Sequence, residues 1–216
     1  MDFTPDKEMN KSESQDPPIV PFSEVVKFHG HFCGGITIGY IASKIAIKEL
    51  RSRRDVDEQL VAIIENDACA IDAIQVVTGC TIGKGNLIFR DYGKQVYTFI
   101  NRATNDAVRI TVKDWPHDAN SALKTLREKV WAGTATPEEI RTMKKQEEES
   151  INRMLAEPPE KYCDVKHVKM EIPGKARIFT SLKCTKCGEM VAEARARVQD
   201  GGFVCIPCFD EYSRGW

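Results

Sequence analysis

The sequence predicts an α+β fold, in which helices pack on an antiparallel sheet, joined to a small C-terminal domain. Short runs rich in Val, Ile and Phe alternate with segments of helical periodicity between Ile19 and Ala156, which indicates the first part of this architecture. Two consecutive prolines, Pro158 and Pro159, mark a boundary. Beyond it lie two Cys-x-x-Cys pairs, a pattern with which a short segment compensates for a small hydrophobic core.

The tail at residues 1–18 mixes Lys, Glu, Asp, Ser and Pro, so we expect it to be disordered. The core domain should extend over residues 19–157 and the small domain over residues 158–216. Within the core, apolar side chains at helical spacing predict a buried helix at 36–50. The β-branched run VAIIE predicts a strand at 61–65.

The rest of the core follows from the same two periodicities. A second helix is predicted at 69–77, ending before Gly79. The other predicted elements are three strands of an antiparallel meander and two helices, at 87–91, 95–101, 107–113, 119–132 and 137–156. Thr136 and Glu139 form a capping box at the start of the last helix, whose charged middle indicates a solvated face. A strand-like stretch at 165–172 would open the small domain.

Composition and charge exclude several classes of protein. The 216 residues are 42% hydrophobic and 29% charged, which is ordinary for a globular protein. No apolar run approaches the roughly 18 residues of a membrane span, and the polar, acidic start is unlike a signal peptide. We therefore expect a cytoplasmic protein without a membrane partner. The formal net charge of -1 disfavours nucleic acid as a partner.

Four cysteines in the small domain have the spacing of a structural zinc site: Cys184, Cys187, Cys205 and Cys208. Two residues between the members of each pair let a tight turn aim both sulfurs at one ion, and a hairpin around the Asp-Gly-Gly at 200–202 would return the second pair to the first. The sequence FDEY after Cys208 can begin a helix, so the segment resembles a treble-clef zinc finger. Four thiolates leave no open position, so the ion would support folding.

The charge of this finger indicates its kind of partner. From Lys161 to Trp216 the charges are only slightly positive in balance, which gives weak support for binding DNA. We expect the finger to contact protein or to stabilise a dimer.

A second group of metal-ligand side chains precedes the first predicted helix: His29, His31 and Cys33 in FHGHFCGG. Three ligands in five residues, separated by glycines, can converge on one metal ion. Cys33 would lie at a helix N-terminus, where the dipole and unpaired amides favour the thiolate. Which histidine faces the ion stays open, because the glycines free the backbone.

Two further cysteines, Cys69 and Cys80, are candidate ligands of this second site, since each lies at a corner between helix and loop. Alone, each is better explained as a small buried hydrophobe, and only beside the histidine cluster do the two interpretations become equal. The loop at 79–86 contains Lys84, but GCTIGKGN lacks the phosphate-binding spacing GxxxxGK[ST], and a turn into the sheet explains its glycines equally well. The remaining cysteine and histidines of the chain are expected to be structural: Cys163, His117 and His167.

These segments together resemble a known family. FHGHFCGG before a buried helix, then NDACAIDAIQVVTGCTIGKGN and RDYGK, are similar to the FmdE family, named for one of the subunits of formylmethanofuran dehydrogenase, over residues 22–155. The finger resembles the treble clef that some archaeal members carry. The resemblance implies an α+β core, intertwined dimers and a metal-associated pocket formed by five residues: His29, His31, Cys33, Cys69 and Cys80. Gly34 stands where the family commonly has proline, which loosens the turn but removes no ligand.

Three functions fit these observations. The leading hypothesis is a metal-binding accessory protein, a homodimer linked to a molybdenum or tungsten dehydrogenase, whose core pocket holds a second zinc or another transition metal. The second is a metal-dependent enzyme acting on a small molecule, with ligands such as His31, Cys33 and Cys80 leaving a position for water or substrate. The third is a thiol redox protein with Cys33 as nucleophile and Cys69 or Cys80 resolving. The candidate catalytic residues are Cys33 and, for moving protons in the enzyme, Asp67, Asp72 and Lys84.

Overall fold

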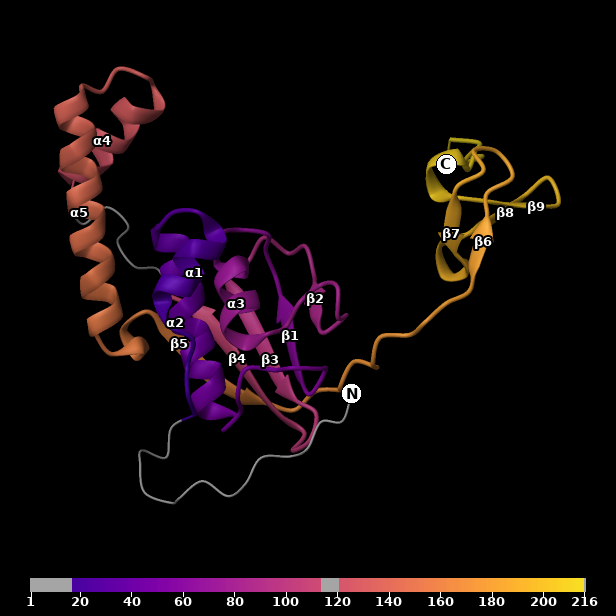
Figure 1. The fold of residues 1–216 in the computed structure, drawn as a ribbon, viewed down its shortest axis with the longest axis horizontal. Coiled ribbons are helices and arrows are strands. Elements are labelled where there is room, and N and C mark those ends of the chain that lie inside the picture. The colour runs from indigo at the N-terminus through magenta and orange to yellow at the C-terminus, as the bar shows by residue number, and fades with distance from the viewer. Residues whose placement is uncertain (1–16, 114–120, 216) are drawn as a thin grey trace, which may run out of the picture. The chain divides into compact units, whose positions relative to one another are not determined.

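The computed structural model describes residues 17–113 and 121–215, which form two compact units divided between Lys175 and Ala176. The tail predicted at the N-terminus, up to residue 16, lies outside the described residues. Among the residues described, no helix combines the length and the apolar character that a membrane span requires. Each unit has strands of its own (Figure 1).

A five-stranded mixed sheet forms the centre of the first unit, in the order β2-β1-β3-β4-β5. The strands are β1 (Leu60–Ile64), β2 (Leu87–Phe89), β3 (Val96–Asn101), β4 (Asp106–Val112) and β5 (Cys163–Val168). All neighbouring pairs are antiparallel except β1 and β2, which are parallel. The predicted meander is therefore wrong in its first strand, because the helix between β1 and β2 carries the chain back across the sheet, as a parallel connection requires.

The strand β5 also corrects the predicted domain boundary at residue 158. It pairs with β4 along its full length, with Cys163 opposite Val112 and Val168 opposite Ala107. The sheet thus gains a strand from beyond the two prolines, and the first unit extends to Lys175. The small domain is therefore shorter than predicted, because this strand and the segment after it belong to the first unit.

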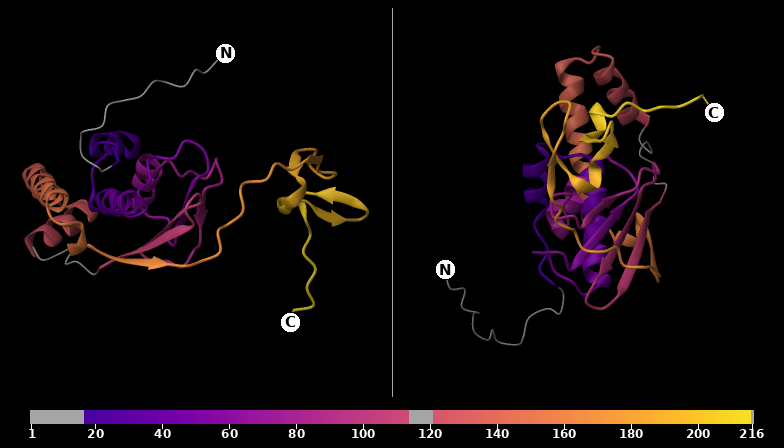
Figure 2. Two further views of the ribbon diagram at one scale, coloured as in Figure 1. Left: turned by 90° about the horizontal axis from the view of Figure 1, so that it is seen from below. Right: turned by 90° about the vertical axis from the view of Figure 1, so that its right-hand side faces the viewer.

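Three helices cover one face of the sheet: α1 (Phe22–His29), α2 (Gly34–Glu49) and α3 (Ala70–Thr78). They lie together on one side of the strands (Figure 2). Buried side chains of α2, among them Ile38, Ile41 and Ile45, join Tyr97 and Phe99 of the sheet in the main core. This arrangement confirms the α+β class and the buried character predicted for α2, whereas α1 was not predicted.

The opposite face of the sheet is covered by the chain after β5. Val61, Ile63 and Ile100 are buried there, with Met170 and Ile172 packed against them. The Arg102 side chain donates hydrogen bonds to the carbonyl groups of Pro173 and Gly174, which fixes the end of this covering segment. Both faces of the central strands are therefore closed to solvent.

The helices α4 (Ser121–Trp131) and α5 (Pro137–Ala156) form a hairpin, and a short 3₁₀ helix (Pro159–Lys161) follows. The capping box of Thr136 and Glu139 is confirmed, since each side chain hydrogen-bonds to the backbone of the other. Arg127 of α4 pairs with Glu147 of α5 at 2.9 Å. Towards its C-terminus α5 joins the main core through Met154.

The second unit contains two hairpins, β6 (Ser181–Lys183) with β7 (Met190–Ala192) and β8 (Arg197–Gln199) with β9 (Gly202–Val204). Asp200 and Gly201 both have positive φ, 51° and 77°, as the tight turn of the second hairpin requires. The helix predicted after Cys208 is absent from residues 209–215. Short 3₁₀ turns at Glu193–Arg195 and Ile206–Cys208 are the helical elements described here.

Candidate metal centres

A reversal of the chain between α1 and α2 places the first group of metal-ligand side chains. Helix α1 ends at His29, and Gly30 follows with φ +91°, a left-handed conformation that leads the chain out of the helix. The Gly30 N–H donates to the Val26 carbonyl at 2.9 Å and closes the last turn. Cys33 is then the N-cap residue of α2, as its place before the glycines predicted.

Three donor atoms converge at this corner. One ligand atom from each of His29, His31 and Cys33 lies within 4.8 Å of the other two, and we name these residues the core cluster. The Cys33 Sγ and His29 Nε2 are 3.9 Å apart, close to the roughly 3.6 Å edge that sulfur and nitrogen ligands of tetrahedral zinc would span. The two histidine rings lie side by side, with centroids 4.5 Å apart. Both histidines are therefore close enough to share an ion with Cys33.

A carboxylate from α3 orients one of these rings. The Asp72 Oδ2 lies 2.7 Å from His29 Nδ1, and the His29 side chain is only 11% exposed. Because a carboxylate can only accept a hydrogen bond, Nδ1 carries the proton, and Nε2 on the Cys33 side keeps its lone pair for a metal ion. This geometry favours an orienting role for Asp72 over the proton transfer considered from the sequence.

Cys69 lies beside the core cluster without belonging to it. A Cβ atom built on Gly35 would be 3.6 Å from the sulfurs of both Cys33 and Cys69, so the two thiols face the same small space. The same atom would be 2.8 Å from the Cys69 Cβ, which leaves room there only for glycine. Desolvation, and then the Cys33 thiol, raise the pKa of Cys69 above its ordinary value. Cys69 can supply a fourth ligand by a small movement of its side chain.

The structure does not bring Cys80 to the core cluster. Its side chain is fully buried in the main hydrophobic core, and its Sγ donates to the Leu60 carbonyl at 3.3 Å. Burial raises the pKa of Cys80 to about 12, so the thiol keeps its proton. Its candidate roles as ligand or resolving cysteine are therefore wrong, because the corner that holds it turns into the core.

The other candidate catalytic residues have different surroundings. Lys84 Nζ lies 3.7 Å from Asp55 Oδ2 and donates to the Asp55 carbonyl, so its charge is compensated at the loop. The Asn86 Oδ1 accepts the Thr81 N–H, which closes this loop on itself and supports the interpretation as a turn. Asp67 is exposed. Of the sequence candidates for proton transfer, Asp72 is the one that contacts the core cluster.

The second group comprises the four cysteines of the small unit: Cys184, Cys187, Cys205 and Cys208. Their sulfurs all lie within 4.8 Å of one another. The Cys187 and Cys205 Sγ atoms are 3.9 Å apart, against roughly 3.8 Å for the edge of a tetrahedral zinc–thiolate site. The N–H groups of Cys187 and Cys205 lower the pKa of Cys184 to about 6. One thiolate is therefore favoured at neutral pH, and the donor set fits a structural zinc ion.

The two groups differ in what they can do chemically. The four-cysteine group offers a closed shell of sulfur ligands, which suits a structural ion. The core cluster offers three mixed ligands at the surface, where His31 is exposed and Cys33 is half-buried. Three protein ligands leave a coordination position for another molecule. The core cluster therefore has the composition of a site that exchanges or uses its ion.

A cavity lies between α1 and α3. Its volume is about 560 Å³, and its lining includes Phe28, Arg54, Gln75 and Val76. Phe28 precedes His29, and Gln75 and Val76 follow Asp72 by three and four positions, hence on the same face of α3. The cavity thus runs along the helices that carry the His29–Asp72 contact.

Comparisons with known proteins agree with the resemblance of the sequence. Residues 28–164 match the family described as FmdE, molybdenum formylmethanofuran dehydrogenase operon. Residues 177–214 match the prokaryotic dksA/traR C4-type zinc finger. The first match covers more than half of the chain and includes the core cluster. The second begins close to the observed boundary between the units.

Two individual proteins are also similar. A probable S-adenosyl-L-methionine-binding protein of Archaeoglobus fulgidus is 32% identical over 193 residues, which are 86% of this chain and 51% of that protein. The chain thus spans about half the length of this relative. The crystal structure of an FmdE-like protein from Syntrophus aciditrophicus, named after tungsten formylmethanofuran dehydrogenase, has a TM-score of 0.56 at 21% identity, covering 86% of this chain and 88% of that one. This second likeness shows a shared fold.

Two features of the core site were missed in the sequence. Helix α1 has Phe22, Val25 and Val26 at helical spacing and Gly30 after its end, a signal that could have placed His29 at a helix terminus. The closeness of Gly35 to Cys69 has no local signal, because it depends on how α2 packs on α3.

Proposed function

The chain is a member of the FmdE family, and we propose that its core binds one divalent transition metal ion through His29, His31 and Cys33, in addition to the structural zinc of the small unit. The observation that carries this proposal is the contact of Asp72 with His29. Histidines that bind metal ions regularly donate their other ring N–H to a carboxylate, which fixes the tautomer and the direction of the ligand nitrogen.

The ligands favour zinc or a neighbouring divalent metal. Two imidazoles and one thiolate form a borderline-soft set, which suits zinc, cobalt or nickel and is a poor match for magnesium or calcium. Cys69 would complete a tetrahedron when no other molecule binds, and its withdrawal would open the position again. The core cluster would therefore hold its ion reversibly, unlike the closed site of the small unit.

We propose further that the protein is an accessory to a molybdenum or tungsten enzyme and works as a homodimer. The family description and the name of the Syntrophus protein both refer to formylmethanofuran dehydrogenase, which supports this link. The surface position of the core cluster suits transfer of an ion to a partner protein. Sedimentation of the full chain at several concentrations tests the dimer, and a protein that stays monomeric at all of them would contradict it.

Metal content per chain tests the core site directly. We expect two ions in the protein purified without added metal and one in Cys33→Ser, with an unchanged circular dichroism spectrum. Asp72→Asn keeps the shape of the carboxylate but loses its charge, and should weaken the second ion about 10- to 100-fold. The control is Cys163→Ala, which removes a thiol outside both groups. A count of one ion in the wild type, unchanged in Cys33→Ser, would refute the core site.

A metal-dependent enzyme is the second candidate, supported by the cavity between α1 and α3. A small molecule in this cavity would lie along the helices that carry His29 and Asp72. S-adenosyl-L-methionine is the first compound to test, because the archaeal relative is named as its probable binder. Calorimetric titration of the metal-loaded chain should show binding that Gln75→Ala and Arg54→Gln weaken. Equal binding to wild type and variants would place the ligand elsewhere.

A further inference from the structure

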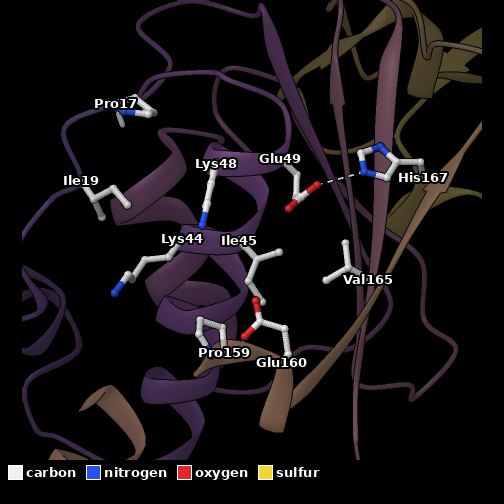
Figure 3. A pocket seen from close by; sticks show the side chains of 10 residues that line it. All are labelled: Pro17, Ile19, Lys44, Ile45, Lys48, Glu49, Pro159, Glu160, Val165 and His167. Atoms are coloured by element: carbon white, nitrogen blue, oxygen red, sulfur yellow. Dashed lines mark hydrogen bonds and ion pairs between the residues drawn. The ribbon is translucent and has the colours of Figure 1, made fainter. Parts of the chain in front are cut away.

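A second cavity lies at the other end of α2 from the core cluster. It has a volume of about 450 Å³, within the usual range for small-molecule sites, and is enclosed by α2, β5, the 3₁₀ helix after α5 and the first described residues of the chain. Ile45 and Val165 form part of its apolar lining (Figure 3). Four separate segments of one unit thus build this cavity, which the metal chemistry does not use.

Two lysines in its lining have no carboxylate partner among the described residues. Lys44 and Lys48 are four positions apart on α2, so they extend from the same side of the helix (Figure 3). Neither forms an ion pair with a described residue, and Lys44 Nζ lies over the Tyr40 ring, 5.8 Å from its centroid. Like charges at this spacing repel each other. An anionic group between the two amines would relieve this repulsion.

The two carboxylates in the lining are not equivalent. Glu49 lies on α2 and its Oε2 is 3.0 Å from His167 Nε2 of β5, so it is already engaged (Figure 3). Glu160 has no ion-pair partner among the described residues, because the contact with Lys113 involves its backbone carbonyl. The described part of the cavity therefore presents two free cations, one free anion and an apolar surface to a ligand.

We propose that this cavity binds a zwitterionic small molecule with an apolar body, of the class of α-amino acids with hydrocarbon side chains. Its carboxylate lies between Lys44 and Lys48, its ammonium group faces Glu160, and its side chain packs on Ile45 and Val165. Each free charge of the lining then has an opposite charge in the ligand. The buried apolar area supplies binding energy, and the ion pairs supply specificity.

Calorimetric titration of the full metal-loaded chain with L-phenylalanine tests the site, with chemical shifts of the Ile45 methyl groups reporting the location. Removing one charge-assisted contact should raise the Kd about tenfold or more. We expect this for Lys48→Gln and Glu160→Gln, and also for two truncated ligands, 3-phenylpropanoate without the ammonium group and 2-phenylethylamine without the carboxylate.

The matched controls are Lys145→Gln and Glu148→Gln, exposed positions of α5 outside the cavity lining. They change the same charges and should leave the Kd within about twofold, since distant surface charges are screened. Equal loss of affinity in cavity and control variants would overturn the site. Equal binding of 3-phenylpropanoate and L-phenylalanine would overturn the role of Glu160, and no heat or shift at saturating concentration would overturn the proposal as a whole.

Discussion

The core cluster and the four-cysteine group use similar ligands on very different supports. In the small unit, the buried apolar residues among those described are Cys184, Val204 and Cys205, so two of the three belong to the four-cysteine group. In the first unit, the main core contains side chains from three helices and five strands, and Cys33 of the core cluster packs against a second apolar cluster. We therefore expect the small unit to need its ion in order to fold, because it buries little apolar surface, and the first unit to fold without one.

This difference separates the structural ion of the small unit from the ion proposed for the core cluster. Where the ligands are the core, loss of the ion removes the fold, and selection for stability alone explains the site. Where the fold forms without the ion, three converging metal-ligand side chains do not contribute to folding, so stability alone does not explain them. The contrast predicts opposite responses of the two units to the same treatment.

Removal of metal should produce the largest effect. A structural zinc ion contributes roughly 10 kcal/mol or more to folding at neutral pH. We therefore expect a strong chelator, or Cys184→Ser, to unfold residues 176–215 and to leave the first unit folded. Amide resonances in a ¹H–¹⁵N spectrum measure both units at once: those of the small unit should collapse to random-coil positions, and those of β1 to β5 should stay dispersed.

Cys33→Ser is the matched comparison, since it also replaces one thiolate ligand. It should leave the resonances of the small unit unchanged and shift those of residues near α1 and α2. Collapse of the whole spectrum under chelation would break the contrast, because it would show that the first unit also requires its ion to fold.

The addition of one methyl group to Gly35 or to Gly34 tests how the packing of the first unit positions the core cluster. A Cβ on Gly35 would lie 2.8 Å from the Cys69 Cβ, whereas a Cβ on Gly34 would meet nothing within 4 Å. Gly35→Ala should therefore force α2 and α3 apart locally and lower the free energy of unfolding by about 1–3 kcal/mol. Gly34→Ala should leave it unchanged or raise it slightly, because alanine favours the helix. Urea unfolding followed by circular dichroism measures both.

The two glycine variants also differ in their expected metal affinity. Movement of Cys69 away from Cys33 would weaken the core ion in Gly35→Ala and leave the small unit's ion in place. Equal stability and equal metal content in the two variants would show that packing between α2 and α3 does not position the core site.

The sequence was more informative about the small unit than about the core site. Ligand spacing along the chain is enough to identify the four-cysteine group, because a tight turn brings the two cysteines of each pair together within a few residues. His29, His31 and Cys33 were found for the same reason. Asp72 is 43 positions from His29, so its orienting role depends on how α3 packs against α1, and no local pattern contains it.

The errors have the same origin in tertiary packing. Cys69 and Cys80 both lie at corners of α3 and were equal candidates, but the first corner opens to solvent and the second is turned into the core. Local propensity predicted the strand β2 but not the strand that pairs with it, because the pairing of β2 with β1 depends on the crossover through α3. The strand β5 was assigned to the wrong domain, because the prolines before it do not show that the chain after them returns to the sheet of the first unit.

Alkaline pH should produce the smallest effect, and it concerns the first unit. Burial raises the pKa of Cys163 to about 12 from an ordinary value of 9.0. Between these values the unfolded chain loses the proton and the folded chain keeps it, so the stability contributed by this protonated thiol is complete below pH 9 and is lost as pH rises towards 12. Cys80 adds a second contribution of the same sign.

Cys163→Ala isolates one of these contributions. The variant leaves a small cavity and should have a lower free energy of unfolding than the wild type at pH 8. The difference between the two proteins should narrow by on the order of 1 kcal/mol between pH 9 and pH 10.5, because the variant has one thiol fewer to ionise when unfolded. Val165→Ala, also in β5, is the control, because it removes no titrating group. The difference in free energy of unfolding between this variant and the wild type should stay constant with pH. Urea unfolding of the first unit at each pH measures both. A gap that widens for Cys163→Ala would mean that the thiol ionises within the folded core, and that this core is more open to water than its packing indicates.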